Sequence, residues 1–179
     1  MAEENGATGA DAANGADNVA PVGAGTLPQV GVIAQYVKDL SFENPNAPAV
    51  YQWQGQPQVD VQFNIGSQPV GEDVYEVALK IEVGSKTDQG TVFTIDLLYG
   101  GLFALKNVPD EQLQPFLLAE APRILFPFAR QVLADATLQG GFPPFLLDPI
   151  DFGSLYMQQA AQQQAGLTGG QAGEVTGQA

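Results

Sequence analysis

Three segments of the chain alternate strictly between apolar and polar side chains, and this period of two limits the possible folds more than any other feature. The apolar positions are Val59, Val61, Phe63 and Ile65, then Tyr75, Val77, Leu79, Ile81 and Val83, then Phe93, Ile95, Leu97 and Tyr99. Such alternation predicts β-strands with one buried and one solvated face. The stretch 30–42 is a fourth strand candidate. It ends before Pro45 and Pro48, because proline cannot donate a ladder hydrogen bond.

The period changes after the glycine pair 100–101, where a helical pattern begins. The stretch 109–141 predicts helices interrupted at Pro115, with Pro122 as the first residue of the second helix. A last helix is expected after Asp151, whose carboxylate can cap the first turn. Strands followed by helices predict an α+β fold.

The helix that begins near Pro122 is apolar around most of its circumference. One face of a sheet can bury only one stripe of a helix. The remaining apolar side chains therefore predict an oligomer, with Ile124, Phe128 and Val132 in the contact between copies. The alternative is that the apolar segment GFPPFLLDPIDF (141–152) of the same chain covers them.

The two ends of the chain differ in composition from the middle. Residues 1–28 are acidic and rich in Ala and Gly, and residues 162–179 are rich in Gln and Gly. Such segments cannot bury enough apolar surface to offset the entropy of ordering, so both are expected to be disordered tails around a folded domain at 29–161. The beginning lacks a signal-peptide pattern and no apolar run reaches about 18 residues, which predicts a cytoplasmic protein without membrane insertion.

The residue types exclude several kinds of chemistry. The chain has no cysteine and no histidine, so thiolate catalysis, imidazole bases and Cys/His zinc sites are impossible. Its 20 acids against 6 bases give a net charge of −14, which disfavours nucleic acid and favours a basic partner. The polar face of the predicted sheet carries Asp60, Glu76, Glu82 and Asp96, and would gain Asp39 and Glu43 if the first strand joins it.

One enzymatic alternative remains, in which Asp148 and Asp151 act as a carboxylate pair on a carbohydrate. Both also have structural explanations, as a turn residue before Pro149 and as a helix cap. No other catalytic constellation is present, so the sequence predicts a protein that is not an enzyme, with no metal site and no cofactor.

Several longer stretches resemble the SecB family of proteobacterial protein-export chaperones. They are YVKDLSFENPNAP (36–48), DVYEVALKIEV (73–83), YGGLFAL (99–105), APRILFPFAR (121–130) and GGFPPFLLDPIDFGSLYMQQ (140–159). The resemblance implies a four-stranded antiparallel sheet with two helices on one face, assembled into a homotetramer as a dimer of dimers. It also implies a cytosolic chaperone that needs no ATP, binds unfolded secretory precursors, keeps them competent for translocation and delivers them to the motor SecA. A general holdase unrelated to export is the alternative.

The resemblance also implies two sets of site residues. The SecA-binding positions are Asp39, Glu43, Thr94 and Asp96, where Thr94 replaces a usual leucine and Asp96 a usual glutamate. The client-binding positions are Tyr51, Trp53, Phe145, Leu146, Phe152 and Tyr156, with Trp53 about two positions before the family tryptophan. Within the proline-rich stretch, Phe142, Leu147 and Ile150 are expected to pack internally, while Phe145, Leu146, Phe152 and Tyr156 face the client.

Overall fold

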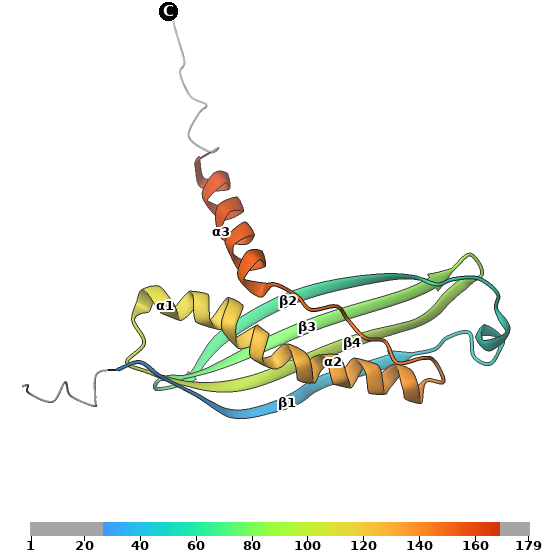
Figure 1. Cartoon of the computed structure of the whole chain (residues 1–179), viewed down its shortest axis with the longest axis horizontal. Coiled ribbons are helices and arrows are strands. Elements are labelled where there is room, and N and C mark those ends of the chain that lie inside the picture. The colour runs from blue at the N-terminus through green and yellow to red at the C-terminus, as the bar shows by residue number, and fades with distance from the viewer. Residues whose placement is uncertain (1–26, 169–179) are drawn as a thin grey trace, which may run out of the picture.

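The computed structural model describes residues 27–168, with side chains as far as Gln162. Four strands form a single antiparallel sheet in the order β1-β4-β3-β2 (Figure 1). They are β1 (Gln29–Glu43), β2 (Gln58–Gly71), β3 (Val74–Thr87) and β4 (Gly90–Lys106), with a short 3-10 helix η1 (Ala49–Gln52) between β1 and β2. The predicted four-stranded antiparallel sheet is confirmed, and the 30–42 stretch forms one of its two edge strands.

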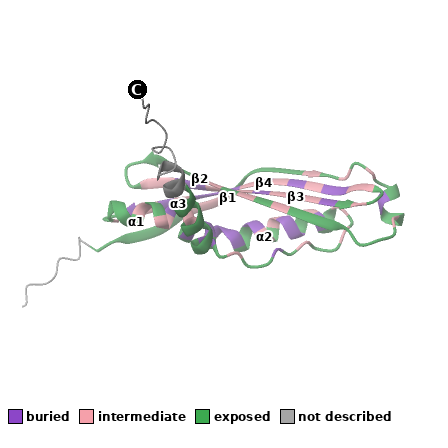
Figure 2. Ribbon diagram, turned by 90° about the horizontal axis from the view of Figure 1, so that it is seen from above, coloured by how far each residue is buried: buried purple, intermediate pink, exposed green. Residues whose placement is uncertain are grey.

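The alternation seen in the sequence separates the two faces of this sheet. Leu79 lies opposite Tyr99 and Ile81 opposite Leu97, and all four are buried on the face that meets the helices, here called the inner face. Lys80 and Glu82 between them point to the other face, which carries no helix and is here called the outer face. The core therefore lies between the inner face and the helical layer (Figure 2).

Strand β4 is longer than the sequence pattern suggested, because it continues through Gly100 and Gly101 to Lys106. The two glycines do not form a turn; they allow side chains of other elements to lie close to the backbone of β4. A Cβ atom at Gly100 would lie 2.7 Å from the ring of Tyr36, and one at Gly101 would lie 2.6 Å from the side chain of Leu125. Glycine within a strand often marks such a contact.

The helical layer is α1 (Asp110–Pro115), a π-helical turn η2 (Phe116–Glu120) and α2 (Ala121–Gln139). Pro115 is the last residue of α1, but the helical backbone continues through η2 into α2, where Pro122 lies in the first turn. The π-helical turn η2 thus separates the two prolines of one continuous helical stretch. Leu125, Ala129 and Leu133 of α2 are fully buried against the sheet. None of the described helices is long and apolar enough to span a bilayer.

A segment without regular structure, here called the strap (residues 141–151), leads from the end of α2 to α3 (Phe152–Thr168). Helix α3 contacts η2 and then projects away from the sheet (Figure 1). It continues past residue 161, the predicted end of the folded domain. The rest of the two predicted tails lies outside the described residues.

Candidate functional site

The four predicted SecA-binding residues all lie on the outer face, on neighbouring strands. Glu43 of β1 lies opposite Thr94 of β4, Ser41 lies opposite Asp96, and Asp39 lies opposite Leu98. Directly opposed residues of an antiparallel pair share a face, with Cβ atoms about 5 Å apart. The structure thus brings these four side chains together in one surface.

A shallow hollow of about 380 Å³ continues this surface across the sheet. The acidic residues that line it are Glu43, Asp60, Glu82 and Asp96. Lys80 offsets part of this charge, because its Nζ lies 2.7 Å from Glu82 and 3.3 Å from Asp96. These two carboxylates raise the pKa of Lys80, Glu82 being the larger cause. No ion pair involves Asp39 or Glu43 among residues 27–162, so no basic side chain of this part of the chain is paired with either carboxylate.

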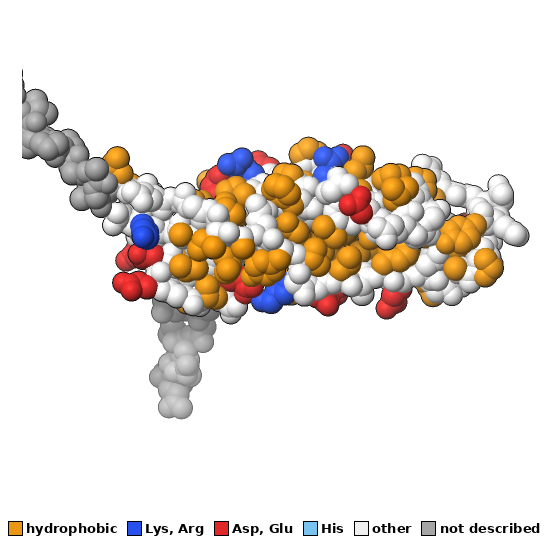
Figure 3. Space-filling model, turned by 90° about the horizontal axis from the view of Figure 1, so that it is seen from below, with side chains coloured by type: hydrophobic (Ala, Val, Ile, Leu, Met, Phe, Trp, Pro, Cys, Tyr) orange, Lys and Arg blue, Asp and Glu red, His pale blue; other side chains and the backbone are white. Residues whose placement is uncertain are grey.

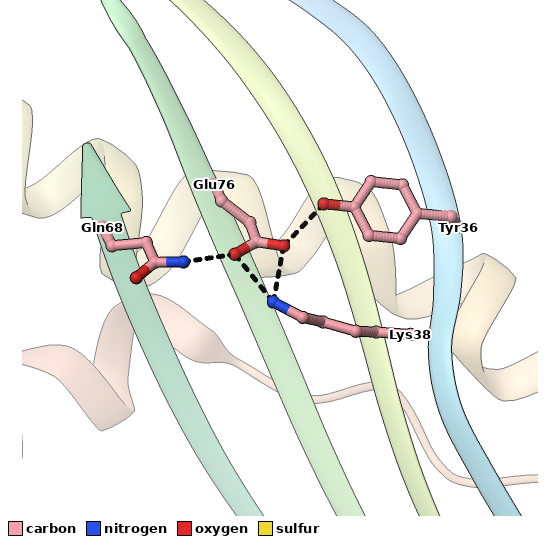
Figure 4. A network of polar contacts seen from close by, with 4 residues as sticks. All are labelled: Tyr36, Lys38, Gln68 and Glu76. Atoms are coloured by element: carbon pink, nitrogen blue, oxygen red, sulfur yellow. Dashed lines mark hydrogen bonds and ion pairs between the residues drawn. The ribbon is translucent and has the colours of Figure 1, made fainter. Parts of the chain in front are cut away.

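Glu76, predicted to belong to this solvated acidic face, is instead 7% exposed. It accepts hydrogen bonds from the Tyr36 hydroxyl at 2.6 Å, from Lys38 Nζ at 2.9 Å to both carboxylate oxygens, and from Gln68 Nε2 at 2.6 Å (Figure 4). The hydrogen bond from Tyr36 is the largest cause that lowers the pKa of Glu76 to about 2, and the same contact raises the pKa of Tyr36 to about 12. This carboxylate is therefore not available to a partner.

The inner face of β1 is largely apolar and uncovered from Val30 to Leu40, whereas Phe42 near its end packs against the core and the end of α2. Its exposed residues are Val30, Val32, Val37 and Leu40, and Leu40 is 42% exposed. On α2, Phe128 is 51% exposed and lies between the half-buried Ile124 and Val132, one turn to either side. Hydrophobic side chains form a broad band along this side of the molecule (Figure 3). The strap does not cover the predicted oligomer residues completely, which was the alternative to an interface.

Tyr51, one of the predicted client-binding residues, lies at the carboxyl end of α2, and Trp53 lies at the β3–β4 turn. The Tyr51 hydroxyl donates to the Gly140 carbonyl at 2.8 Å, and its ring centre is 5.5 Å from that of Phe142. Tyr51 also lines a hollow of about 400 Å³ together with Leu40, Phe42, Asn44, Ala136, Gln139 and Gly140. Trp53 is half-buried and packs near Gly90 in the β3–β4 turn.

The other four predicted client residues lie along the strap and at the start of α3. Leu146 is 58% exposed, while Phe145 and Tyr156 are half-buried. Phe152 is 2% exposed, with its ring centre 5.7 Å from that of Phe126, so its assignment to the client-facing surface is wrong for this conformation. The predicted internal packing of Leu147 is confirmed, since that side chain is buried.

The client-binding candidates thus form a line and not a single cluster. Tyr51 contacts the helix end at Gly140, whereas Phe152 contacts Phe126, fourteen residues earlier. This spacing corresponds to about 21 Å along a helix axis at 1.5 Å per residue. The strap connects the two ends, so an occupant of the whole line would have to be extended.

Thr137 is a structural residue that the sequence reasoning missed. Its side chain is completely buried, and its hydroxyl lies 2.9 Å from the Ala134 carbonyl and accepts a 2.9 Å hydrogen bond from the Phe145 N–H. The Phe142 N–H also reaches the Thr137 carbonyl at 3.1 Å. Thr137 therefore holds the strap against α2. A polar residue on the buried face of a helix was the available signal.

The carboxylate pair of the enzymatic alternative has no catalytic geometry. Asp151 accepts hydrogen bonds from the Ser154 hydroxyl at 2.7 Å and from the Ser154 N–H at 3.0 Å, as a helix cap does. These bonds hold the pKa of Asp151 below its usual range, while a general acid needs a raised pKa. The predicted cap is confirmed. No group of three or more potential metal-ligating side chains occurs among the described residues.

Comparisons with known proteins agree with this arrangement. The family model for the preprotein translocase subunit SecB matches residues 24–163. The protein-export protein SecB of Zymomonas mobilis is 67% identical over 137 residues, covering 76% of this chain and 84% of the relative. That of Sphingopyxis alaskensis is 64% identical over 169 residues, covering 94% and 95%.

A solved structure shares the fold at low sequence identity. It is a SecB-like chaperone of Mycobacterium tuberculosis in complex with an antitoxin peptide, with a TM-score of 0.57, 17% identity and coverage of 68% of this chain and 90% of that one. The matched family model, the relatives and the shared fold point the same way, and the chain belongs to the SecB family.

Proposed function

We propose that this chain is a cytoplasmic, ATP-independent chaperone that binds unfolded secretory precursors and delivers them to SecA. The observation that carries this proposal is the separation of two unlike surfaces on the two faces of one sheet. The outer face is acidic and free of helices, while apolar side chains remain exposed on the inner face and along the strap. Such a molecule can bind an unfolded precursor through its apolar surface while its acidic face stays free to bind SecA.

Apolar contact is suited to unfolded clients because it is not directional. Burial is worth roughly 25 cal/mol per Å² of apolar area, from which the costs of association are subtracted. The line from Tyr51 along Leu146 towards Tyr156 offers separate small sites that a single extended chain could occupy together. The Mycobacterium tuberculosis chaperone that shares the fold was solved with a peptide, which supports this mode of binding.

The acidic surface around Asp39 and Glu43 is the proposed SecA-binding site. Asp96 adds charge beside them, although Lys80 partly offsets it. Thr94, at the position of a usual leucine, is half-buried between the acidic side chains and supplies only a methyl group for apolar contact. Recognition of a basic partner would therefore act mainly through charge complementarity, which governs association rate and specificity.

The apolar band formed by β1 and α2 supports assembly into a homotetramer. Exposed apolar patches of this kind on a soluble chain mark interaction sites. The proposed contact residues on α2 are Ile124, Phe128 and Val132, next to the uncovered inner side of β1. An oligomer links several client sites, so one long client gains affinity from filling more than one.

The test is the formation of a ternary complex. An unfolded secretory precursor is bound first, purified SecA is added, and the mass of the complex is measured by native mass spectrometry. Simultaneous binding is expected because the two surfaces lie on opposite faces. Client binding without any SecA binding would instead support a general holdase, and binding of neither would reject the proposal.

A further inference from the structure

Strand β1 has two register shifts against β4, one between Val32 and Ala34 and one between Val37 and Asp39, and the extra residue of the second reverses which of the following side chains face outward. Val37 lies opposite Tyr99 on the inner face, but Asp39 lies opposite Leu98 on the outer face, and Lys38 has no opposed residue of its own. Two residues thus face one on the partner strand, which defines a β-bulge. In a regular strand Val37 and Asp39 would share a face. The bulge is therefore what places Asp39, Ser41 and Glu43 on the outer face.

Within a single chain, burial does little to hold β1 in this register. A register is strongly specified where one face of a strand is buried, and weakly where it is not. The inner side chains of β1 on either side of the bulge, Val37 and Leu40, are exposed in the single chain, and among the described strands β1 pairs with β4 alone. Before the proposed assembly covers this side of β1, another interaction within the chain has to fix the position of the bulge.

The hydrogen bonds at Glu76 supply that interaction. Lys38, the extra residue of the bulge, and Tyr36, two residues before it, both donate to this carboxylate of β3, and Gln68 of β2 donates from the far side (Figure 4). These four residues are here called the clamp. It connects β1 to β3 and β2 across β4.

Small residues on β4 and its neighbours leave room for the hydrogen bonds of the clamp to form across β4. Tyr36 lies opposite Gly100, and Gly100 lies opposite Ala78, which lies opposite Gly66 of β2. This row of small residues leaves a path over which Tyr36 and Lys38 reach Glu76. A Cβ atom at Gly100 would stand 2.7 Å from the Tyr36 ring, while one at Gly66 would meet nothing within 4 Å.

We propose that the clamp is a positioning device for the acidic docking surface, in which Lys38 and Tyr36 hold the β1 bulge and thereby set Asp39 and Glu43 outward. This rests on the proposed function, since it assumes that a basic surface of SecA docks there. Lys38 acts through the position of Asp39 and not by contact with the partner, because its ammonium group is bound to Glu76.

If Lys38 acts only through its charge, its removal should have the opposite effect on SecA binding from the one expected if it positions Asp39 and Glu43. Lys38→Met removes a positive charge from the face, so charge alone predicts tighter binding of SecA. If the clamp positions Asp39 and Glu43, binding weakens, by roughly three- to thirtyfold as for other residues that act through coupled contacts. Lys38→Arg should restore most of the affinity. Tyr36→Phe and Gly100→Ala, which change no charge, should weaken binding as Lys38→Met does, and Gly66→Ala should not.

The experiment measures SecA affinity by calorimetry, client holding by light scattering, and amide hydrogen exchange of residues 37–43 in the full chain. The expected result for Lys38→Met is weaker SecA binding, unchanged client holding and faster exchange in this part of β1. Equal or tighter binding, or unchanged exchange, overturns the proposal.

Asp39→Asn with Glu43→Gln tests the docking surface itself. If this double variant binds SecA as well as the unmodified chain, the proposed docking site is wrong. Amide hydrogen exchange of residues 37–43 alone then decides whether the clamp holds the bulge.

Discussion

The buried hydroxyl of Thr137 accepts a hydrogen bond of 2.9 Å from the backbone N–H of Phe145, and so joins the last turn of α2 to the proline-rich strap. The same hydroxyl lies 2.9 Å from the carbonyl oxygen of Ala134 and 3.1 Å from that of Leu133. The Thr137 hydroxyl thus forms hydrogen bonds both within its own helix and to a segment that has no regular structure. It explains how a stretch with several prolines keeps a defined path.

Thr137→Val is expected to destabilise the protein by about 1–3 kcal/mol, because it leaves the Phe145 N–H without its acceptor at a partly buried position. Valine keeps the volume of threonine, so packing is little changed. Thr137→Ser, which keeps the hydroxyl, is the matched control and should lose less. Denaturant unfolding at one fixed protein concentration measures both, and equal loss in the two variants would show that the methyl group and not the hydrogen bond matters.

Charge reversal at the outer face is expected to separate the two binding activities. Asp39→Lys with Glu43→Lys should reduce SecA affinity at least tenfold, a cost of about 1.4 kcal/mol. Suppression of client aggregation should remain. Glu72→Lys with Asp88→Lys makes the same change of charge in exposed turns and should have a much smaller effect. Parallel loss of client holding in the first variant would instead indicate a damaged fold.

The clamp gives stability a defined dependence on pH. The folded-state pKa of Glu76 lies at about 2, below its ordinary value of 4.5. The ionised Glu76 therefore adds to the free energy of unfolding above pH 4.5, and this stabilisation is lost as the pH falls towards 2. The pKa of Tyr36 is raised from 10.0 to about 12, so its contribution is present below pH 10 and is lost as the pH rises towards 12. The difference in unfolding free energy between the unmodified chain and Tyr36→Phe, followed between pH 8 and about 12, should shrink only at the alkaline end. A difference independent of pH would contradict this assignment.

Introducing a charge into the apolar band is expected to break the assembly. Phe128→Asp places a carboxylate where a second copy would bury a ring, and an unpaired buried charge is costly. Native mass spectrometry should show smaller species than for the unmodified chain. Gln112→Asp adds a similar charge on exposed α1 and should leave the mass unchanged. If Phe128→Asp keeps the mass of the unmodified chain, this stripe of α2 is not in the interface.

The strands could be predicted from the sequence because burial of one face imposes a period of two. Leu79, Ile81 and Leu97 are buried as the alternation required. The end of β4 could not be predicted, since glycine serves equally in turns and in close contacts, and only the positions of Tyr36 and Leu125 distinguish the two. The sheet-face positions Asp39 and Glu43 were placed correctly, although the bulge at Lys38 that turns them outward leaves no mark in the composition.

The remaining errors concern burial by distant segments. Glu76 looked like any other polar residue of a solvated face, and only the approach of β1 encloses it. Phe152 stood in an aromatic stretch suited to a client, but its ring fills space beside Phe126. The local sequence pattern predicts the face on which a side chain lies. Whether that side chain is buried depends also on residues far along the chain.

The most direct measurement of the central claim is the aggregation of an unfolded secretory precursor, diluted from denaturant and followed by light scattering without any nucleotide. An equimolar amount of the chain, counted as tetramer, should suppress the scattering, and the held precursor should pass to SecA when the motor is added. Unchanged scattering even in the presence of a molar excess of the chain would contradict the account.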